Sequence, residues 1–166
     1  MKTNLSILFV IALFTCPSLK GQTDNAKEEA AIKAVFEADK TAYFNQDYIE
    51  MGENWVKEPS TMKYYLTPKG STKIIGWENV DASQKKETED NSWDRNQVKA
   101  TFSNYRINIM DNSAWVFCET DWEGMFKGEK INLKQERIVV MKKVDGKWKF
   151  SLMGIFRLPN EVSTNQ

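Results

Sequence analysis

The segment from residue 24 to residue 44 repeats apolar residues with a helical period. Asp24 or Asn25 is suited to cap this first helix, because a short polar side chain accepts hydrogen bonds from its free N–H groups. The residues at helical spacing form one apolar face: Ile32, Val35, Phe36, Ala42 and Tyr43. Asp39 lies on the same face, seven residues after Ile32. The pattern therefore predicts a helix that turns one carboxylate toward its apolar partners.

Shorter patterns follow between residues 48 and 88. Residues 48–55 predict a second helix, which ends before Pro59 because a proline disfavours the helical conformation of the preceding residue. Residues 62–66 and 73–75 predict two short strands joined by the turn at 67–70. Residues 78–88 predict a third helix, polar and lysine-bearing on one side.

The second half of the chain alternates with the period of β-strands. Long strands are predicted at residues 98–110, 113–122, 131–144 and 147–158, and the dipeptides at 111–112 and 145–146 are typical of tight hairpin turns. Helices first and hairpins afterwards predict an α+β fold, in which about three helices pack on one face of a curved antiparallel sheet. No repeat or linker divides residues 22–158, which form a single predicted domain followed by a polar tail at 159–166.

The first 21 residues have the three parts of a secretory signal peptide. Lys2 precedes an apolar run of about ten residues, and Gly21 is a small residue at the cleavage position. The run is shorter than the roughly 20 apolar residues that span a bilayer. We therefore expect an exported protein, periplasmic or secreted, with no transmembrane segment after the signal. In an alternative interpretation, Cys16 is the lipid-anchor cysteine of a bacterial lipoprotein.

Charge and residue counts exclude several kinds of site. The chain has 23 basic and 23 acidic side chains, and loss of the signal removes only lysines, so no basic footprint for nucleic acid is expected. There is no histidine, which removes histidine bases, Ser-His-Asp and Cys-His nucleophiles and imidazole metal ligands. Cys118 is expected to be a small buried hydrophobe. No phosphate-binding glycine loop or EF-hand pattern occurs, so we expect no cofactor and no metal site.

Four short segments carry a resemblance to a known family. They are Ala-Tyr-Phe-Asn-Gln-Asp at 42–47, Gly-Trp-Glu at 76–78, Ala-Trp-Val at 114–116 and Asp-Gly-Lys-Trp-Lys-Phe at 145–150. Together with the order of elements, they make the chain resemble the nuclear transport factor 2-like superfamily, in its bacterial SnoaL-like branch, over about residues 27–158. The resemblance implies a cone-shaped, cystatin-like roll with a pocket at its open end, and homodimers paired through the outer sheet face. It also implies functions that range from isomerases, dehydratases and cyclases to non-catalytic binding modules, so the fold does not decide the function.

Carboxylates and tyrosines are the remaining candidates for catalysis. A buried carboxyl with a raised pKa can move a proton while a tyrosine donates to a developing oxyanion. Ketosteroid-isomerase-like members of the superfamily use this combination. The candidates here are Asp39, Tyr43 and Asp121, none of which matches a known catalytic pattern.

Each candidate also has a structural interpretation. Asp39 could pair with a sheet arginine such as Arg137 or be partly exposed, Tyr43 could be a core residue, and Asp121 could belong to a cross-strand charge ladder. The acidic cluster at residues 87–90 is interpreted as a solvated helix end.

The aromatic residues suggest where a ligand could bind. Large amphipathic side chains suit the lining of a pocket for a small apolar molecule, with core packing as the alternative. The predicted ligand-binding residues are Tyr43, Trp55, Tyr64, Trp77, Trp122, Arg137 and Met153. The main hypothesis is an exported domain that binds a small apolar or amphipathic molecule without catalysis. The alternatives are a cofactor-free isomerase, dehydratase or cyclase, and a dimerising protein-interaction module.

Overall fold

The computed structural model describes residues 18–92 and 94–157. Most of the predicted signal peptide, including Cys16, lies outside the described residues, as does the predicted tail at 159–166. The helices of the described chain are α1 (Ser18–Phe44), α2 (Tyr48–Glu53) and α3 (Trp77–Glu89). Its strands are β1 (Met62–Thr67), β2 (Gly70–Ile75), β3 (Lys99–Met110), β4 (Ser113–Phe126), β5 (Glu129–Val144) and β6 (Lys147–Arg157).

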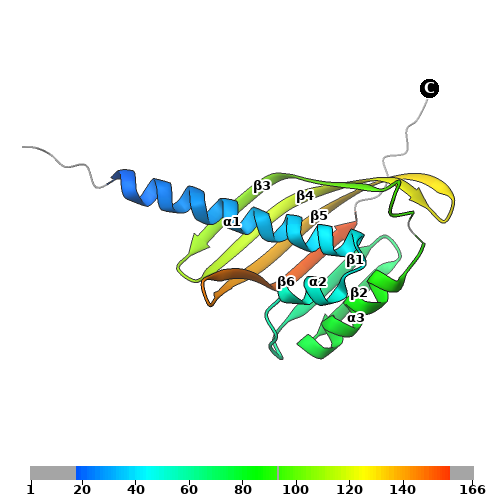
Figure 1. The fold of residues 1–166 in the computed structure, drawn as a ribbon, viewed down its shortest axis with the longest axis horizontal. Helices are drawn as coiled ribbons and strands as arrows, with labels where there is room; N and C mark the ends of the chain where they lie inside the picture. Colours follow the sequence, from blue (N-terminus) through cyan, green and yellow to red (C-terminus); the bar gives the residue numbers. More distant parts are fainter. Residues whose placement is uncertain (1–17, 93, 158–166) are drawn as a thin grey trace, which may run out of the picture.

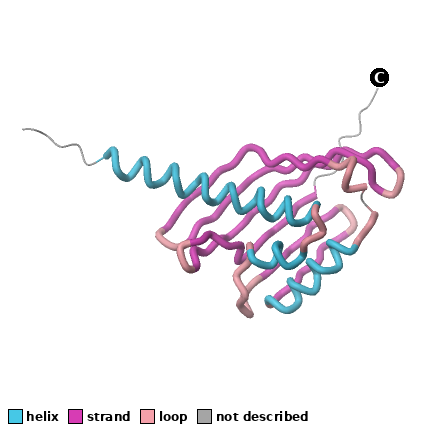
Figure 2. The backbone as a smooth tube through the Cα atoms, viewed as in Figure 1, coloured by secondary structure: helices cyan, strands magenta, loops and turns pink. Residues whose placement is uncertain are grey.

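The six strands form one curved sheet in the order β2-β1-β6-β5-β4-β3. Neighbouring strands are antiparallel except β1 and β6, which pair in parallel. The helices lie on one side of this sheet, with the long α1 crossing the strands and α2 and α3 below its C-terminal end (Figures 1 and 2). The predicted α+β class and the helix-then-hairpin order are confirmed, with a mixed rather than purely antiparallel sheet.

The predicted start of the first helix is wrong. α1 begins at Ser18 and continues through Asp24 and Asn25 without a break. A polar side chain that can cap a helix does not end one, because the backbone hydrogen bonds continue wherever the preceding residues accept helical angles.

α1 buries the predicted apolar face against the sheet. Ile32 and Phe36 are almost fully buried, and the Phe36 ring meets the rings of Phe102, Tyr105 and Phe150 edge-on at 5.1–5.6 Å. Each such side chain contributes roughly 1.5–3 kcal/mol through its burial. This contact fixes α1 over the sheet, so that Asp39, one turn beyond Phe36, also faces the strands.

The alternation of β4 defines two different faces of the sheet. Cys118 and Thr120 are fully buried on the inner face, toward the helices, whereas Trp115 on the outer face is 42 % exposed. Cys118 is a free, buried cysteine, as predicted. It stands opposite Arg137 in the pairing of β4 with β5, which places the Arg137 side chain on the inner face as well.

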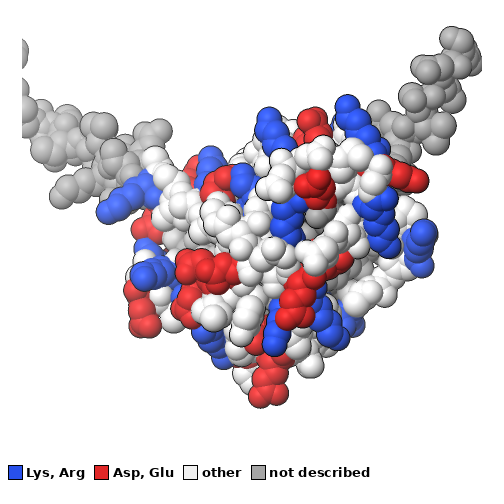
Figure 3. Space-filling model, turned by 45° about the vertical axis from the view of Figure 1, so that its right-hand side comes forward, with Lys and Arg blue, Asp and Glu red and all other residues white. Residues whose placement is uncertain are grey.

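The surface mixes charges of both signs. On the face shown in Figure 3, acidic and basic side chains are interspersed. Within residues 18–92 and 94–157, no helix is long and apolar enough to cross a membrane.

Candidate functional site

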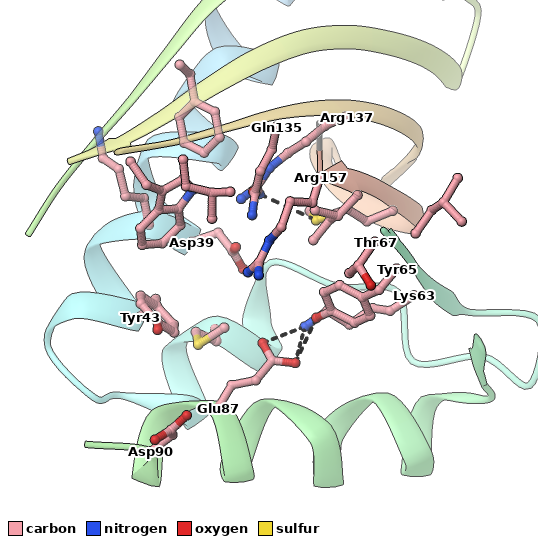
Figure 4. Close-up of a pocket in the computed structure, with 18 residues that line it drawn as sticks. Asp39, Tyr43, Lys63, Tyr65, Thr67, Glu87, Asp90, Gln135, Arg137 and Arg157 are labelled. Carbon is pink, nitrogen blue, oxygen red and sulfur yellow. Dashed lines mark hydrogen bonds and ion pairs between the residues drawn. The ribbon is translucent and has the colours of Figure 1, made fainter. Parts of the chain in front are cut away.

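A pocket of about 280 Å³ lies between the inner sheet face and the C-terminal half of α1. One part of its wall is apolar, formed by Met51, Leu66, Phe102, Trp122, Leu133, Met153 and Ile155. Polar side chains converge from the other elements, as Figure 4 shows: Asp39, Tyr43, Lys63, Tyr65, Glu87, Gln135, Arg137 and Arg157. The sheet and helices thus enclose a space with both apolar and charged walls.

Asp39 is the carboxylate that α1 brings into the pocket. It is partly buried, and its Oδ1 accepts a hydrogen bond from the Trp55 indole at 3.4 Å. Removal from water raises the pKa of Asp39 to about 6, against the opposing attraction of Lys63 and Arg137. A carboxyl with this pKa exists in both protonation states near neutral pH and can accept or release a proton there.

A second carboxylate, Glu87 of α3, is tied into a network with β1. Both of its oxygens accept hydrogen bonds from Lys63 Nζ, at 2.9 and 3.0 Å. The Tyr65 hydroxyl and the Ser83 hydroxyl each donate to Oε1 at 2.8 Å. Burial opposes the charge on Glu87, but these donors hold the pKa of its carboxyl below the usual range. Glu87 is therefore a fixed anion whose charge Lys63 neutralises.

The same network sets the state of its donors. Burial acts to lower the pKa of Lys63, but the nearby oxygens of Tyr65 and Glu87 raise it by more. The pKa of Lys63 is therefore above its usual value, and the ammonium stays charged. Burial raises the pKa of Tyr65 to about 12, so this hydroxyl keeps its proton and its bond to Glu87. The Lys63–Glu87–Tyr65 network is thus a rigid polar wall rather than a source of protons at neutral pH.

Arg137 occupies the pocket from β5. Its guanidinium lies over the Phe102 ring at 5.0 Å from the centroid, and Nη1 donates a long hydrogen bond of 3.6 Å to Met153 Sδ. No ion pair or hydrogen bond joins it to Asp39 among the described residues. Asp39 therefore forms no direct pair with Arg137 and is influenced by it only through its charge, while the partial exposure that its structural interpretation also allowed is observed.

The comparisons with known proteins agree on the fold. No family profile and no curated protein matches the sequence. Among solved structures, a candidate scytalone dehydratase of Novosphingobium aromaticivorans superposes with a TM-score of 0.69 and 16% identity, over 83% of this chain and 89% of that one. A candidate dehydratase of the NTF2-like family from Streptomyces avermitilis has a TM-score of 0.65 and 11% identity, over 80% and 97% of the two chains. The chain has the nuclear transport factor 2-like fold. A Nostoc punctiforme protein of unknown function with a cystatin-like fold has the same TM-score as the Streptomyces protein, 0.65, with 12% identity over 81% of this chain and 94% of that one.

Within this nuclear transport factor 2-like fold, five of the predicted site residues meet in one pocket. They are Asp39, Tyr43, Trp122, Arg137 and Met153. The Tyr43 ring packs edge-on against Trp122 at 5.7 Å, and the Arg95 guanidinium lies over the Tyr43 ring, 4.6 Å from its centroid. Burial raises the pKa of the Tyr43 hydroxyl, so it remains a donor. Asp39 and Tyr43 therefore face the same space, one helical turn apart.

The other predicted residues lie elsewhere in the fold. Trp55 is a core residue, 1% exposed, that reaches the pocket only through its bond to Asp39. Trp77 packs beside Gly52 between α3 and α2. Tyr64 and Asp121 belong to the outer sheet face. Successive side chains of a strand point to opposite faces, and Tyr65 and Trp122, the residues that follow them, line the pocket on the inner face.

Several pocket residues were not predicted. They are Lys63, Tyr65, Glu87, Gln135 and Arg157. Glu87 contradicts the interpretation of its cluster as a solvated helix end, because its carboxylate points into the pocket toward β1 (Figure 4). On β1 only Tyr64 was predicted to line the pocket, yet it is Lys63 that is 3% exposed. The sequence of a strand does not show that one of its lysines is buried in a pocket, unless the carboxylate that pairs with it is also known.

Proposed function

We propose that this domain binds a small amphipathic molecule in the pocket between α1 and the inner sheet face. The supporting observation is the division of one cavity into an apolar wall and a convergent set of charged groups. Ligand sites of proteins have this composition, and a volume of about 280 Å³ suits a small ligand. Lys63 and Glu87 neutralise each other, while Asp39, Tyr43 and Arg137 present polar atoms that can contact a ligand in the cavity.

Native mass spectrometry tests this proposal on protein purified from its own host. We expect a reproducible non-covalent adduct that denaturation releases. The variant Ile155→Trp fills the pocket and is expected to lose the adduct, whereas Leu152→Trp on the outer sheet face is the matched control that keeps it. A clean ligand-free mass for the wild type, together with no stabilisation by any small amphipathic molecule, would contradict the proposal.

A second candidate function is cofactor-free proton transfer, as in an isomerase, dehydratase or cyclase. It is favoured by the raised pKa of Asp39, caused by burial, and by the Tyr43 donor one turn away. Two solved structures of the same fold carry dehydratase names. Asp39 would accept a proton from carbon, and Tyr43 would donate a hydrogen bond to the oxygen that becomes negative.

Hydrogen exchange at the α-carbon of phenylacetone in D₂O, followed by NMR, separates this candidate from simple binding. Catalysed exchange that falls by about 100-fold in Asp39→Asn, and not in the outer-face variant Asp121→Asn, would support proton transfer. A rate equal to that of the buffer alone would leave binding as the function of the pocket.

We also infer that the protein acts after export. The supporting observation is the signal-like pattern of residues 1–21, with its short apolar run behind Lys2. N-terminal sequencing of protein recovered outside the cytoplasm is expected to begin at Gln22. A lipid-modified N-terminus at Cys16 would show instead that the protein is a lipoprotein.

A further inference from the structure

Arg137 is a buried cation that forms no direct ion pair with any acid of the described residues. The residue is 7% exposed, and the only hydrogen bond of its guanidinium within the described part of the chain is the long contact with Met153 Sδ. The Nε atom is buried and has no acceptor at all among the described residues. In Figure 4 the side chain enters the pocket beside Gln135, with its nitrogens directed toward the open space.

Lys63, the other buried cation of the pocket, has an anionic partner. Lys63 is as deeply buried as Arg137, but both oxygens of Glu87 lie within 3.0 Å of its ammonium group. A buried charge is costly unless it is paired, and arginine cannot lose its proton to escape that cost. Asp39, whose charge interacts with that of Arg137, can become neutral by taking up a proton. The positive charge that the pocket leaves without a direct partner would therefore be matched by an anion.

We propose that the pocket selects small carboxylic acids, with the ligand carboxylate on the Arg137 guanidinium and the apolar body against Phe102, Trp122 and Leu133. This inference rests on the proposed binding function and specifies its ligand class. Guanidinium and carboxylate match in shape and can form two parallel hydrogen bonds, which the thioether of Met153 cannot provide. Gln135, whose side-chain Oε1 is buried and has no hydrogen-bond partner among the described residues, adds a polar group to the same pocket.

The apolar wall limits what is attached to the carboxylate. The Phe102 ring already lies against the guanidinium, and Leu133, Met153 and Ile155 continue the wall along β5 and β6. A cavity of about 280 Å³ with these sides accepts a short alkyl or single-ring aromatic body. Arg157, at the end of β6, has no ion pair among the described residues and adds positive charge at the edge of the pocket.

Binding of an anion would also change the protonation of Asp39. A carboxylate on Arg137 removes one of the charges that favour ionised Asp39 and adds a negative charge nearby, so the bound state favours neutral Asp39. The charged or titratable groups that share the pocket with Asp39 are Lys40 and Tyr43 of α1, Lys63 and Tyr65 of β1, Glu87 of α3, Asp90, Arg137 of β5 and Arg157 of β6. Since Glu87 is held ionised by Lys63, Asp39 is the acid whose proton responds to the ligand, and affinity falls as pH rises above about 6.

Calorimetric titration with matched ligands tests the selection on the protein without its signal peptide. The probes are phenylacetate and hexanoate, each compared with its neutral amide, and 2-phenylethylamine as the cation. We expect each acid to bind on the order of tenfold more tightly than its amide at about pH 5, and the amine to bind least. In Asp39→Asn the affinity for the acids is expected to become independent of pH between about 5 and 8.

Two variants assign the effect to Arg137. Arg137→Lys retains the charge and is expected to keep part of the preference for acids, whereas Arg137→Met is expected to lose it. Arg106→Met, an arginine of the outer sheet face, is the control and should bind as the wild type does. Without ligand, Arg137→Met is expected to melt at a higher temperature than the wild type, because it replaces an unpaired buried cation with an apolar side chain.

The outcomes separate this inference from the proposed function. Amides or amines that bind as tightly as the acids would overturn the selection of carboxylates and leave amphipathic binding intact. Failure of every probe to bind at millimolar concentration would overturn both. The comparison of acid with amide needs only the wild-type protein, so the test does not depend on the folding of any variant.

Discussion

At the scale of single residues, the carboxyl of Asp39 makes stability depend on pH. Burial raises the pKa of Asp39 from 3.8 to about 6, so the folded protein binds a proton more tightly than the unfolded chain does. The stability that this proton provides is complete below about pH 4 and is lost as pH rises through about 6. Because the carboxyl is partly buried, its ionisation costs at most about 3 kcal/mol.

Asp39→Asn removes this cost without changing the shape of the side chain. We expect the variant to exceed the wild type in free energy of unfolding by about 2 kcal/mol at pH 8, and to equal it at about pH 4. Urea denaturation at a series of pH values measures the difference, with Asp121→Asn on the outer face as the control. A constant difference at all pH values would show that Asp39 does not titrate between these limits.

At the scale of elements, the Lys63–Glu87 pair joins α3 to β1. The Lys63 side chain is 4% exposed and the Glu87 side chain 31% exposed, so the pair is partly shielded from water. Glu87→Gln would leave the buried ammonium without its anion. We expect a loss of about 2 kcal/mol in the free energy of unfolding, since removal of one partner of a buried pair costs more than the pair contributes.

Glu53→Gln is the matched control for this prediction. Glu53 and Lys57 form an ion pair of 2.8 Å, but both side chains are about half exposed, and such pairs contribute little. Denaturant unfolding of the two variants is expected to separate them clearly. Equal, small effects would show that water screens Lys63 as well. The double variant Lys63→Met with Glu87→Gln should recover much of the loss, because neither charge of this pair remains.

Gly124 allows the loop after α3 to lie against β4. A Cβ at this position would be 2.5 Å from the Gln97 carbonyl oxygen and 2.7 Å from the Val98 Cα. We expect Gly124→Ala to destabilise the protein by about 2 kcal/mol, since backbone must move to admit the methyl group. Gly128→Ala, in the turn of the same hairpin, is the comparison: it has positive φ but no neighbour within 4 Å, so only backbone strain of roughly 1 kcal/mol is expected. Similar melting temperatures for the two variants would contradict this account.

The elements themselves could be predicted from local patterns, and the site only in part. The helical period brought Asp39 and Tyr43 onto the face of Phe36, and alternation separated Asp121 from Trp122, because both patterns depend on residues close in sequence. The inner face of β1 could not be predicted in this way, because Tyr64 and Tyr65 are neighbours of equal polarity. The residues of β1 that face inward are set by its parallel pairing with β6 and by the position of Glu87 in α3, and both are contacts between segments distant in the chain.

At the scale of the whole molecule, the helices cover one face of the sheet, and within the described residues no segment covers the other (Figure 1). The outer face carries apolar side chains at its centre: Trp115 and Val140 are directly opposite each other on β4 and β5 and are 42% and 37% exposed, and Ile138 beside them is 47% exposed. Adjacent exposed apolar side chains on a sheet are typical of surfaces that bind another protein. The pocket opens on the inner side, so an interface here would leave it free.

We therefore expect the protein to form a homodimer through this outer face. Pairing two copies of the patch would bury Trp115, Ile138 and Val140 against their own symmetry mates, which satisfies the self-complementarity of a two-fold interface. Val140→Lys places two like charges at the centre of that interface and should yield a monomer in light scattering at micromolar concentration. Ile49→Lys, which alters an exposed apolar residue of α2 away from the sheet, should remain dimeric. Since Val140 points away from the inner face, the monomeric variant is expected to keep the affinity of the pocket for its ligand. A wild type that is monomeric at every concentration tested would show that the outer face binds a different partner or none.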